Sequence, residues 1–387
     1  MTSPMPRPTH RQRPATGPLS PVPSRSGFTL VEILVVITII GILAGIAVPA
    51  IQGGVYRANV AAIKLEVNSI ASAIDKYSLK YGDYPPDFSD KSVIDRHYRK
   101  VFPRMSEDEA GLLDAMVGTG VSFDPTIIDR AEALVWCLGG YSDDIQRPFT
   151  APGGPLDWIG SGTYLAATSI EKRTPTNYQI NSDRTNKLFD FAAERLTIGS
   201  VNSSAALSPT NRYISSEESG TGDLVPTYLA REGGAPFVYF DARTYRKQHA
   251  TLGMNGYAGS GFGFVRPYIS DLVKKVTTTA NFLSLPDALQ SWQFVNPDTF
   301  QVISAGMDDS FGQVDLTDVG DAADRPVYFQ YPSGDALAPR INVATAGALK
   351  IGTVSKFQEN SLGGNADEFV ADNIANFSKA EIVDDIP

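Results

Sequence analysis

One stretch of 23 residues, from 28 to 50, limits what this chain can fold into more than any other part of it. It is almost wholly apolar and consists of FTLVEILVVITIIGILAGIAVPA. A helix of this length rises by about 35 Å, which is enough to cross the hydrocarbon core of a bilayer. The sequence therefore predicts a membrane-spanning helix over 28–50 that carries one carboxylate, Glu32, near its start.

The segment before this helix, residues 1–27, has the composition of a cationic leader. It contains four arginines and many prolines but no acidic residue. A segment of this kind is expected to be unfolded. Positive charge on one flank of a membrane helix keeps that flank in the cytoplasm, so the chain after residue 50 is expected to lie across the membrane.

A secretory signal peptide is the first alternative, because it would be cut after the apolar stretch, next to the small residues of AGIAVPA. Glu32 argues against this interpretation. A charged carboxylate inside a membrane helix costs about 3 kcal/mol and persists only where it has a partner or a function. A simple signal peptide has no use for such a group.

The residues around this carboxylate, SGFTLVE at 26–32, resemble the N-terminal signal of type IV prepilins and type II secretion pseudopilins. The resemblance covers residues 26–50 and implies that a prepilin peptidase cuts between Gly27 and Phe28 and then methylates the amino group of Phe28. It also implies an assembly role for Glu32, whose carboxylate would pair with the Phe28 amine of a neighbouring subunit. Such pairing neutralises two charges that would otherwise lie alone in lipid.

Two features follow within and after the apolar stretch. Pro49 removes one backbone hydrogen bond, so a kink or local melting is predicted near 45–49; a proline that only marks the membrane exit is the alternative. Beyond it, apolar residues at spacings of three and four predict an amphipathic helix over 51–82 that packs on its own domain rather than in a coiled coil. These residues are Val60, Ile63, Val67, Ile70, Ile74, Tyr77 and Tyr81.

Residues 83–387 are expected to form a globular domain rich in turns, since the chain has 34 Gly and 26 Pro. Short helices are predicted in MSEDEAGLLDAMV, where Ser106 and Glu109 have capping-box spacing, and in IIDRAEALVWCLGG. Strands are predicted in APFVYFDART, DTFQVISAGMD and RPVYFQYP, as parts of an antiparallel sheet. Together with the resemblance, these patterns indicate a pilin-like α+β fold with a long N-terminal helical spine on an antiparallel sheet and large loop insertions. The glycine-rich GYAGSGFGF at 256–264 is interpreted as a flexible or bulged loop.

Acidic residues near the C-terminus resemble the calcium-binding loop of major pseudopilins. The segments concerned are FQVISAGMDDSFG and GGNADEFVADNIANFS, which about 50 residues separate here, whereas they are nearly adjacent in that group. Asp309 also replaces the usual glycine. Calcium prefers six to eight oxygen ligands, so a structural Ca²⁺ is a hypothesis, against the alternative that these residues are solvated turn acids. The candidate ligands are Asp308, Asp309, Asp367, Asp372 and Ser304.

The net charge and the absence of catalytic motifs argue against nucleic-acid binding and against catalysis. The net charge of −10 argues against a nucleic-acid-binding protein. Cys137, the single cysteine, is expected to be buried, while His97 and His249 are expected at the surface, and no hydrolase or metalloprotease motif is present. We therefore expect no enzyme, although a carboxylate pair of the kind found in glycosidases is not visible in a sequence.

The expected function is that of a structural subunit of a type II secretion-like pseudopilus or type IV pilus-like filament that supports protein secretion. The resemblance implies a single-pass protein of the bacterial inner membrane with its C-terminal domain in the periplasm. Its implied partners are other copies of itself, other pseudopilins, the prepilin peptidase and an inner-membrane assembly platform. The alternatives are a minor or tip pseudopilin, and a membrane-anchored surface enzyme or carbohydrate-binding protein with a prepilin-type signal.

Overall fold

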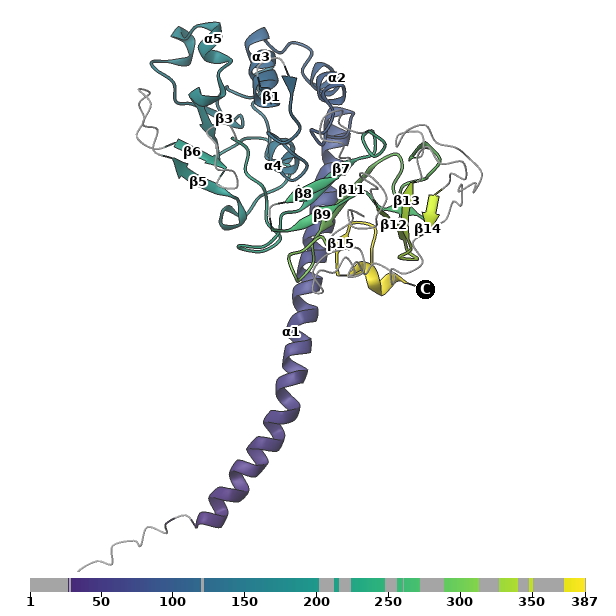
Figure 1. Ribbon diagram of the computed structural model, residues 1–387. Helices are drawn as coiled ribbons and strands as arrows, with labels where there is room; N and C mark the ends of the chain where they lie inside the picture. The colour runs from purple at the N-terminus through teal and green to yellow at the C-terminus, as the bar shows by residue number, and fades with distance from the viewer. Residues whose placement is uncertain are drawn as a thin grey trace, which may run out of the picture. The chain divides into compact units, whose positions relative to one another are not determined.

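The computed structural model describes residues 27, 29–119, 122–201, 212–215, 224–247, 256–259, 261–271, 289–312, 327–339, 348–350 and 372–386. The chain divides into two units, residues 1–55 and 56–387. Helix α1, Leu30–Tyr81, makes up nearly all of the described part of the first unit and continues into the second (Figure 1). At 52 residues it is far longer than an average globular helix.

In the first unit, the apolar side chains of α1 are exposed throughout residues 30–55. This part is long and apolar enough to cross a membrane. The helix is continuous through Pro49, so the predicted local melting is wrong. Proline removes a single hydrogen bond, and the apolar helix formers on both sides hold the remaining ones.

In the second unit, α1 presents an apolar stripe to the domain. Its buried residues are Val60, Ile63, Val67, Ile70, Ala73, Ile74 and Tyr77. The prediction of an amphipathic helix that packs on its own domain is thereby confirmed, while Leu65 on the other face stays 68% exposed. The helix ends where Gly82 takes a φ of +71°, a left-handed conformation that glycine adopts without a steric penalty.

A three-stranded antiparallel sheet lies against this stripe. Its strand order is β15-β11-β7, with bounds Ile374–Ala375, Phe300–Ser304 and Val238–Asp241. Alternate residues of β11 enter two different apolar clusters: Phe300 and Val302 join the α1 side, and Ile303 joins the opposite side. Because both faces are covered, every residue of β11 is buried, and its two polar side chains, Gln301 and Ser304, are hydrogen-bonded.

The third predicted strand belongs to a different sheet. Strand β12, Tyr328–Tyr331, pairs in parallel with β10, Ile269–Ser270, and antiparallel with β13, Ala336–Pro339. Strand β14, Ala348–Lys350, completes the order β10-β12-β13-β14. The prediction of one antiparallel sheet for all three strands is therefore wrong, because a short aromatic run fits an inner position of either sheet.

Short helices and hairpins occupy the remainder of the described domain. The helices are α2 Lys91–Val101, α3 Glu107–Met116, α4 Glu132–Leu138 and α5 Ser169–Lys172, with short 3-10 turns at Tyr164–Ala166, Pro175–Asn177, Ala193–Arg195 and Ile382–Asp385. The hairpins are β1 Gly118–Thr119 with β2 Ser122–Phe123, β3 Leu156–Trp158 with β4 Tyr178–Ile180, β5 Ile198–Val201 with β6 Arg212–Ser215, and β8 Tyr257–Gly259 with β9 Gly263–Val265. The glycine-rich segment interpreted as a loop is thus the β8–β9 hairpin.

The two predicted helices are confirmed, with one change of detail in α3. Ser106 caps its start by accepting the backbone N–H of Glu109. The Glu109 carboxylate instead turns inward, where it accepts the backbone N–H of Phe149 at 2.8 Å and the hydroxyl of Thr150. Only half of the predicted capping box forms, because these two inner donors hold the buried carboxylate.

His97 is buried, so the prediction of a surface position is wrong. Its Nε2 lies 2.7 Å from the hydroxyl of Tyr77 on α1, and its Nδ1 lies 3.0 Å from Asp83. Burial lowers the pKa of His97. The polar residues around His97 in the sequence suggested exposure. The side chain is buried because its hydrogen-bond partners, Tyr77 and Asp83, lie on α1 and in the turn after it.

Candidate functional site

The start of helix α1 is held by a reciprocal pair of hydrogen bonds between Thr29 and Glu32. The backbone N–H and the hydroxyl of Thr29 donate to Oε2 of Glu32 at 2.8 and 2.9 Å, and the N–H of Glu32 donates to the Thr29 hydroxyl at 3.2 Å. This is a capping box, which satisfies N–H groups that have no partner inside the helix. The Thr-x-x-Glu spacing of residues 29–32 is the sequence signal for this cap.

The capping box leaves half of the carboxylate available. Both Thr29 bonds end on Oε2, and within the described chain Oε1 of Glu32 accepts no hydrogen bond. A negative group at a helix N-terminus is also favoured by the helix dipole. The geometry can therefore present one oxygen to a cation while the other holds the first turn of the helix.

The predicted cleavage residues flank this cap. Gly27 is exposed, and a side chain added there would meet no atom within 4 Å. Phe28 lies outside the described residues. Exposure of Gly27 is what access by a processing enzyme requires.

The predicted calcium ligands divide into groups. Asp372 accepts the backbone N–H groups of Met307 and Asp308 on Oδ2, at 3.0 and 3.3 Å. Its other oxygen, Oδ1, is buried and has no hydrogen-bond partner in the described chain. Burial, and then the nearby charge of Asp308, raises the pKa of Asp372 to about 7. The structure therefore places two of the five predicted ligands, Asp308 and Asp372, next to each other.

The remaining three candidates are placed differently. Asp309 is paired with Arg231, whose Nε lies 3.1 and 3.0 Å from its two oxygens, and it also accepts the backbone N–H of Ala235. Ser304 is buried and its hydroxyl accepts the N–H of Gly306 at 3.3 Å. Asp367 lies outside the described residues. Among the residues that the structure does describe, no three acidic, histidine or cysteine side chains are grouped to hold a metal ion.

Sequence reasoning missed the contacts by which α1 holds the C-terminal segment. The hydroxyl of Tyr56 donates to Glu381, and Lys64 donates to the carbonyl of Ala375 at 2.7 Å. Gly306 allows the end of β11 to approach the same segment, since a side chain there would collide with the carbonyl of Asp372. Tyr56 and Lys64 lie more than 300 residues from their partners in the chain, so no local pattern signals these contacts.

A long N-terminal helix, apolar and exposed in its first part and covered by an antiparallel sheet in its second, defines a pilin-like α+β protein. Residues 23–48 match the family model described as the prokaryotic N-terminal methylation motif. The resemblance to pilins and type II secretion pseudopilins is thereby confirmed.

Similar curated proteins come from both branches of this group. Type II secretion system core protein G of Pseudomonas aeruginosa is 44% identical over 61 residues, which are 16% of this chain and 43% of that protein. The type IV major pilin protein PilE of Neisseria gonorrhoeae is 41% identical over 69 residues, 18% of this chain and 41% of that protein. The chain thus matches less than half the length of these relatives. No solved structure matches it.

Proposed function

We propose that this chain is a structural subunit of a type II secretion-like pseudopilus, or of a related type IV pilus-like filament, that supports protein secretion. A prepilin peptidase would cut between Gly27 and Phe28 and methylate the new Phe28 terminus. Helix α1 would hold the subunit in the bacterial inner membrane, with the C-terminal domain in the periplasm. The match of residues 23–48 to the methylation motif supports this proposal.

The observation that carries the proposal is that Thr29 donates its hydrogen bonds to only one of the two carboxylate oxygens of Glu32. A charge at the start of an exposed apolar helix is costly in lipid unless a counter-ion arrives. The Thr29 cap keeps Oε1 available, and the Phe28 amine of a neighbouring subunit is a counter-ion that exists only after the leader is removed. Assembly would therefore become possible only after cleavage, and charge pairing would fix how far neighbouring helices are shifted along one another.

The four leader arginines support the proposed orientation, because positive charge is retained on the cytoplasmic side. Their removal leaves 29 basic and 43 acidic residues, a formal charge of −14 before the new amine is counted. Neighbouring copies would then repel one another through their domains. Contacts within the membrane helices, and bound cations, would have to offset that repulsion.

The size of the domain favours one variant of this proposal. About 300 residues follow the spine, which is large for a subunit that repeats at close spacing. A minor or tip pseudopilin, placed once per filament, has no such packing limit. In either position the partners would be other pseudopilins, the prepilin peptidase and the inner-membrane assembly platform.

We further propose a structural Ca²⁺ at the acidic pair of Asp308 and Asp372. Two carboxylates close enough to raise a pKa repel each other, and a divalent cation would relieve that repulsion. The unpartnered Oδ1 of Asp372 would supply one ligand. Asp367 and backbone carbonyls would supply others, whereas Asp309 would stay with Arg231.

Mass analysis of the N-terminus tests the central proposal. The full chain would be produced with and without a prepilin peptidase, and the mature protein purified from membranes. We expect a chain that begins at methylated Phe28 only when the peptidase is present. A mature chain that still carries the leader, or that begins after Ala50, would overturn it.

A further inference from the structure

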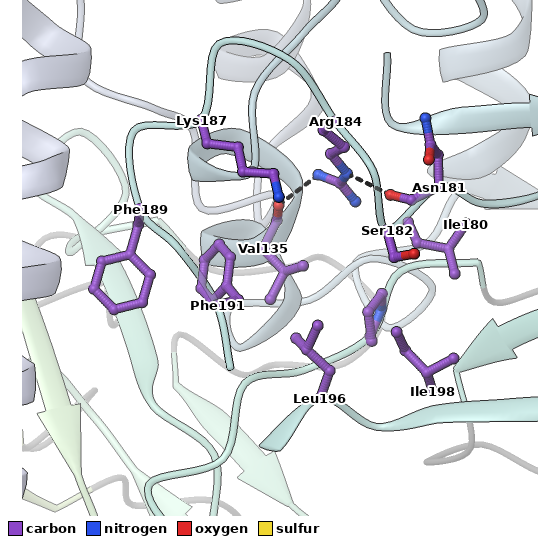
Figure 2. Close-up of a pocket in the computed structure, with 12 residues that line it drawn as sticks. Val135, Ile180, Asn181, Ser182, Arg184, Lys187, Phe189, Phe191, Leu196 and Ile198 are labelled. Atoms are coloured by element: carbon purple, nitrogen blue, oxygen red, sulfur yellow. Dashed lines mark hydrogen bonds between the residues drawn. The ribbon is translucent and has the colours of Figure 1, made fainter. Parts of the chain in front are cut away.

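A small pocket lies between helix α4 and strand β5, and it combines positive charge with an apolar wall (Figure 2). Its volume is about 40 Å³, room for a few non-hydrogen atoms. Figure 2 shows Arg184 and Lys187 on one side and Leu196 and Ile198 on the opposite side. Phe189 and Phe191, both half-buried, also line it.

Arg184 is the unusual member of this lining, because its side chain is only 7% exposed. Its Nε donates to the carbonyl of Asn181 at 3.1 Å, and its Nη1 donates to the carbonyl of Val135 at 2.7 Å. Both interactions are dashed in Figure 2. These two bonds fix the guanidinium plane in the wall of the pocket, so its orientation does not depend on a ligand.

The guanidinium has no counter-ion in the part of the chain that the structure describes. No carboxylate forms an ion pair with Arg184 there, and its Nη2, which carries two N–H groups, donates to none of the described residues. Burial lowers the pKa of Arg184 to about 10. Buried charges in proteins are normally paired, so an unpaired guanidinium in a pocket wall marks a missing anion.

A second cation stands at the mouth of the pocket. Lys187 is exposed, and its nearest acid, Asp190, lies 3.8 Å away with a side chain that is 93% exposed. Exposed pairs of this kind are weak, so Lys187 remains free to contribute to another anion. One buried and one exposed cation above an apolar wall form an environment for a ligand with a charged head and an apolar body.

We propose that this pocket binds a carboxylate that carries a short apolar group. The carboxylate would accept from Nη2 of Arg184 and lie near the ammonium of Lys187, while the apolar group would contact Leu196 and Ile198. A carboxylate rather than a phosphate fits best, because the pocket is small and half of its lining is aliphatic or aromatic. A free organic acid and the C-terminal end of a polypeptide share this chemistry. The proposal is independent of filament assembly.

Calorimetry on the full chain in detergent tests the proposal with two near-isosteric probes, propionate and propionamide. Propionamide, which lacks the negative charge, should bind at least about tenfold more weakly than propionate, because hydrogen bonds to a charged partner are stronger than those to a neutral one. Equal binding of the acid and the amide, or binding of neither, would overturn the proposal. A short peptide that ends in valine with a free carboxylate serves as a second probe. Tighter binding of this peptide than of propionate identifies a chain terminus as the ligand, and weaker binding identifies a free acid.

Variants separate this site from general charge effects. Arg184→Ala would leave buried carbonyls without donors, so misfolding would obscure its effect. Lys187→Met is the informative change because this side chain is exposed. We expect it to weaken propionate binding about fivefold, whereas Lys76→Met, which removes an exposed lysine of α1, should leave binding unchanged. The same affinity in both variants would place the anion elsewhere and refute the proposed site.

Discussion

The carboxylate of Glu32 receives both hydrogen bonds from Thr29 on a single oxygen, Oε2, at 2.8 and 2.9 Å. The arrangement gives one residue two separable properties. It completes the cap of α1, which a neutral amide can also do, and it carries a negative charge, which an amide lacks. Substitutions can therefore distinguish a helix cap from an assembly charge.

Replacing Glu32 by glutamine tests which property matters. The amide oxygen can still accept from Thr29, so the start of α1 should be retained, but no charge remains for the amine of a neighbour. We expect both Glu32→Gln and Glu32→Ala to accumulate as processed membrane monomers without filaments. Thr29→Ala should cost about 1 kcal/mol of helix capping and still assemble. Filament recovery after shearing measures this, and wild-type assembly of Glu32→Gln would contradict the charge-pairing proposal.

Chelation tests the proposed Ca²⁺ site. If the ion is bound at a hundred times its dissociation constant, its removal should destabilise the folded chain by about 2.7 kcal/mol, or roughly 5 °C in Tm. Asp308→Ala should lower the Tm and abolish the response to chelator. Asp309→Ala is the matched control: it loses the pair with Arg231 and lowers the Tm, but should keep the response. Insensitivity of the wild-type Tm to chelator and to added Ca²⁺ would remove the site from consideration.

The apolar stripe of α1 offers a matched pair of core and surface substitutions. Ile70 is fully buried, so Ile70→Ala should lower the free energy of unfolding by about 2–5 kcal/mol. Leu65 is 68% exposed on the opposite face, and Leu65→Ala should change it by less than about 0.5 kcal/mol. Chemical denaturation of the detergent-solubilised monomer measures both. Similar losses for the two variants would mean that α1 does not pack as described.

Glu109 predicts a dependence of stability on pH. Burial raises its pKa from 4.5 to about 7, so between these values the folded chain holds a proton that the unfolded chain releases. The contribution of Glu109 to the free energy of unfolding therefore falls as pH rises through that window. Glu109→Gln removes this dependence and should be more stable than the wild type at pH 8, by up to about 3 kcal/mol, and similar to it near pH 4.5.

Denaturation of the wild type and Glu109→Gln at several pH values measures this difference. Other buried acids, such as Asp372 and Asp241, also have raised pKa values and will affect both proteins alike. The difference between the two curves therefore reports Glu109 itself. A difference that stays constant from pH 4.5 to 8 would show that the carboxylate is charged throughout.

Sequence patterns predicted the features of this molecule that depend on residues close together in the chain. The spacing of Val67, Ile70 and Ile74 identified the buried face of α1, and the helix predicted to end at residue 82 ends at Tyr81. The strand β11 was recognisable because it contains an aromatic residue, Phe300, and the β-branched residues Val302 and Ile303. Each of these signals lies within a few residues of the structure that it predicts.

The features that sequence patterns missed depend on partners far away in the chain. The buried position of His97 is stabilised by Tyr77 and Asp83, and no local pattern requires it. Asp309 was predicted as a metal ligand, but it is paired with Arg231, which lies 78 residues earlier in the chain. Sheet membership of β12 was likewise decided by pairing with β10, which sequence periodicity does not encode.

The last described segment, 372–386, is fastened to α1 through Lys64 and Ala375 and supplies β15 at the edge of β11. The edge of β11 and the face of α1 around Lys64 are therefore covered only after residues 374–375 have been synthesised. A nascent chain interrupted before Ile374 leaves β11 with an unpaired edge and the α1 face around Lys64 uncovered, which is the kind of surface that proteases and chaperones bind. A molecule that lacks residues 374–386 would therefore differ from one that has them by an exposed strand edge on β11.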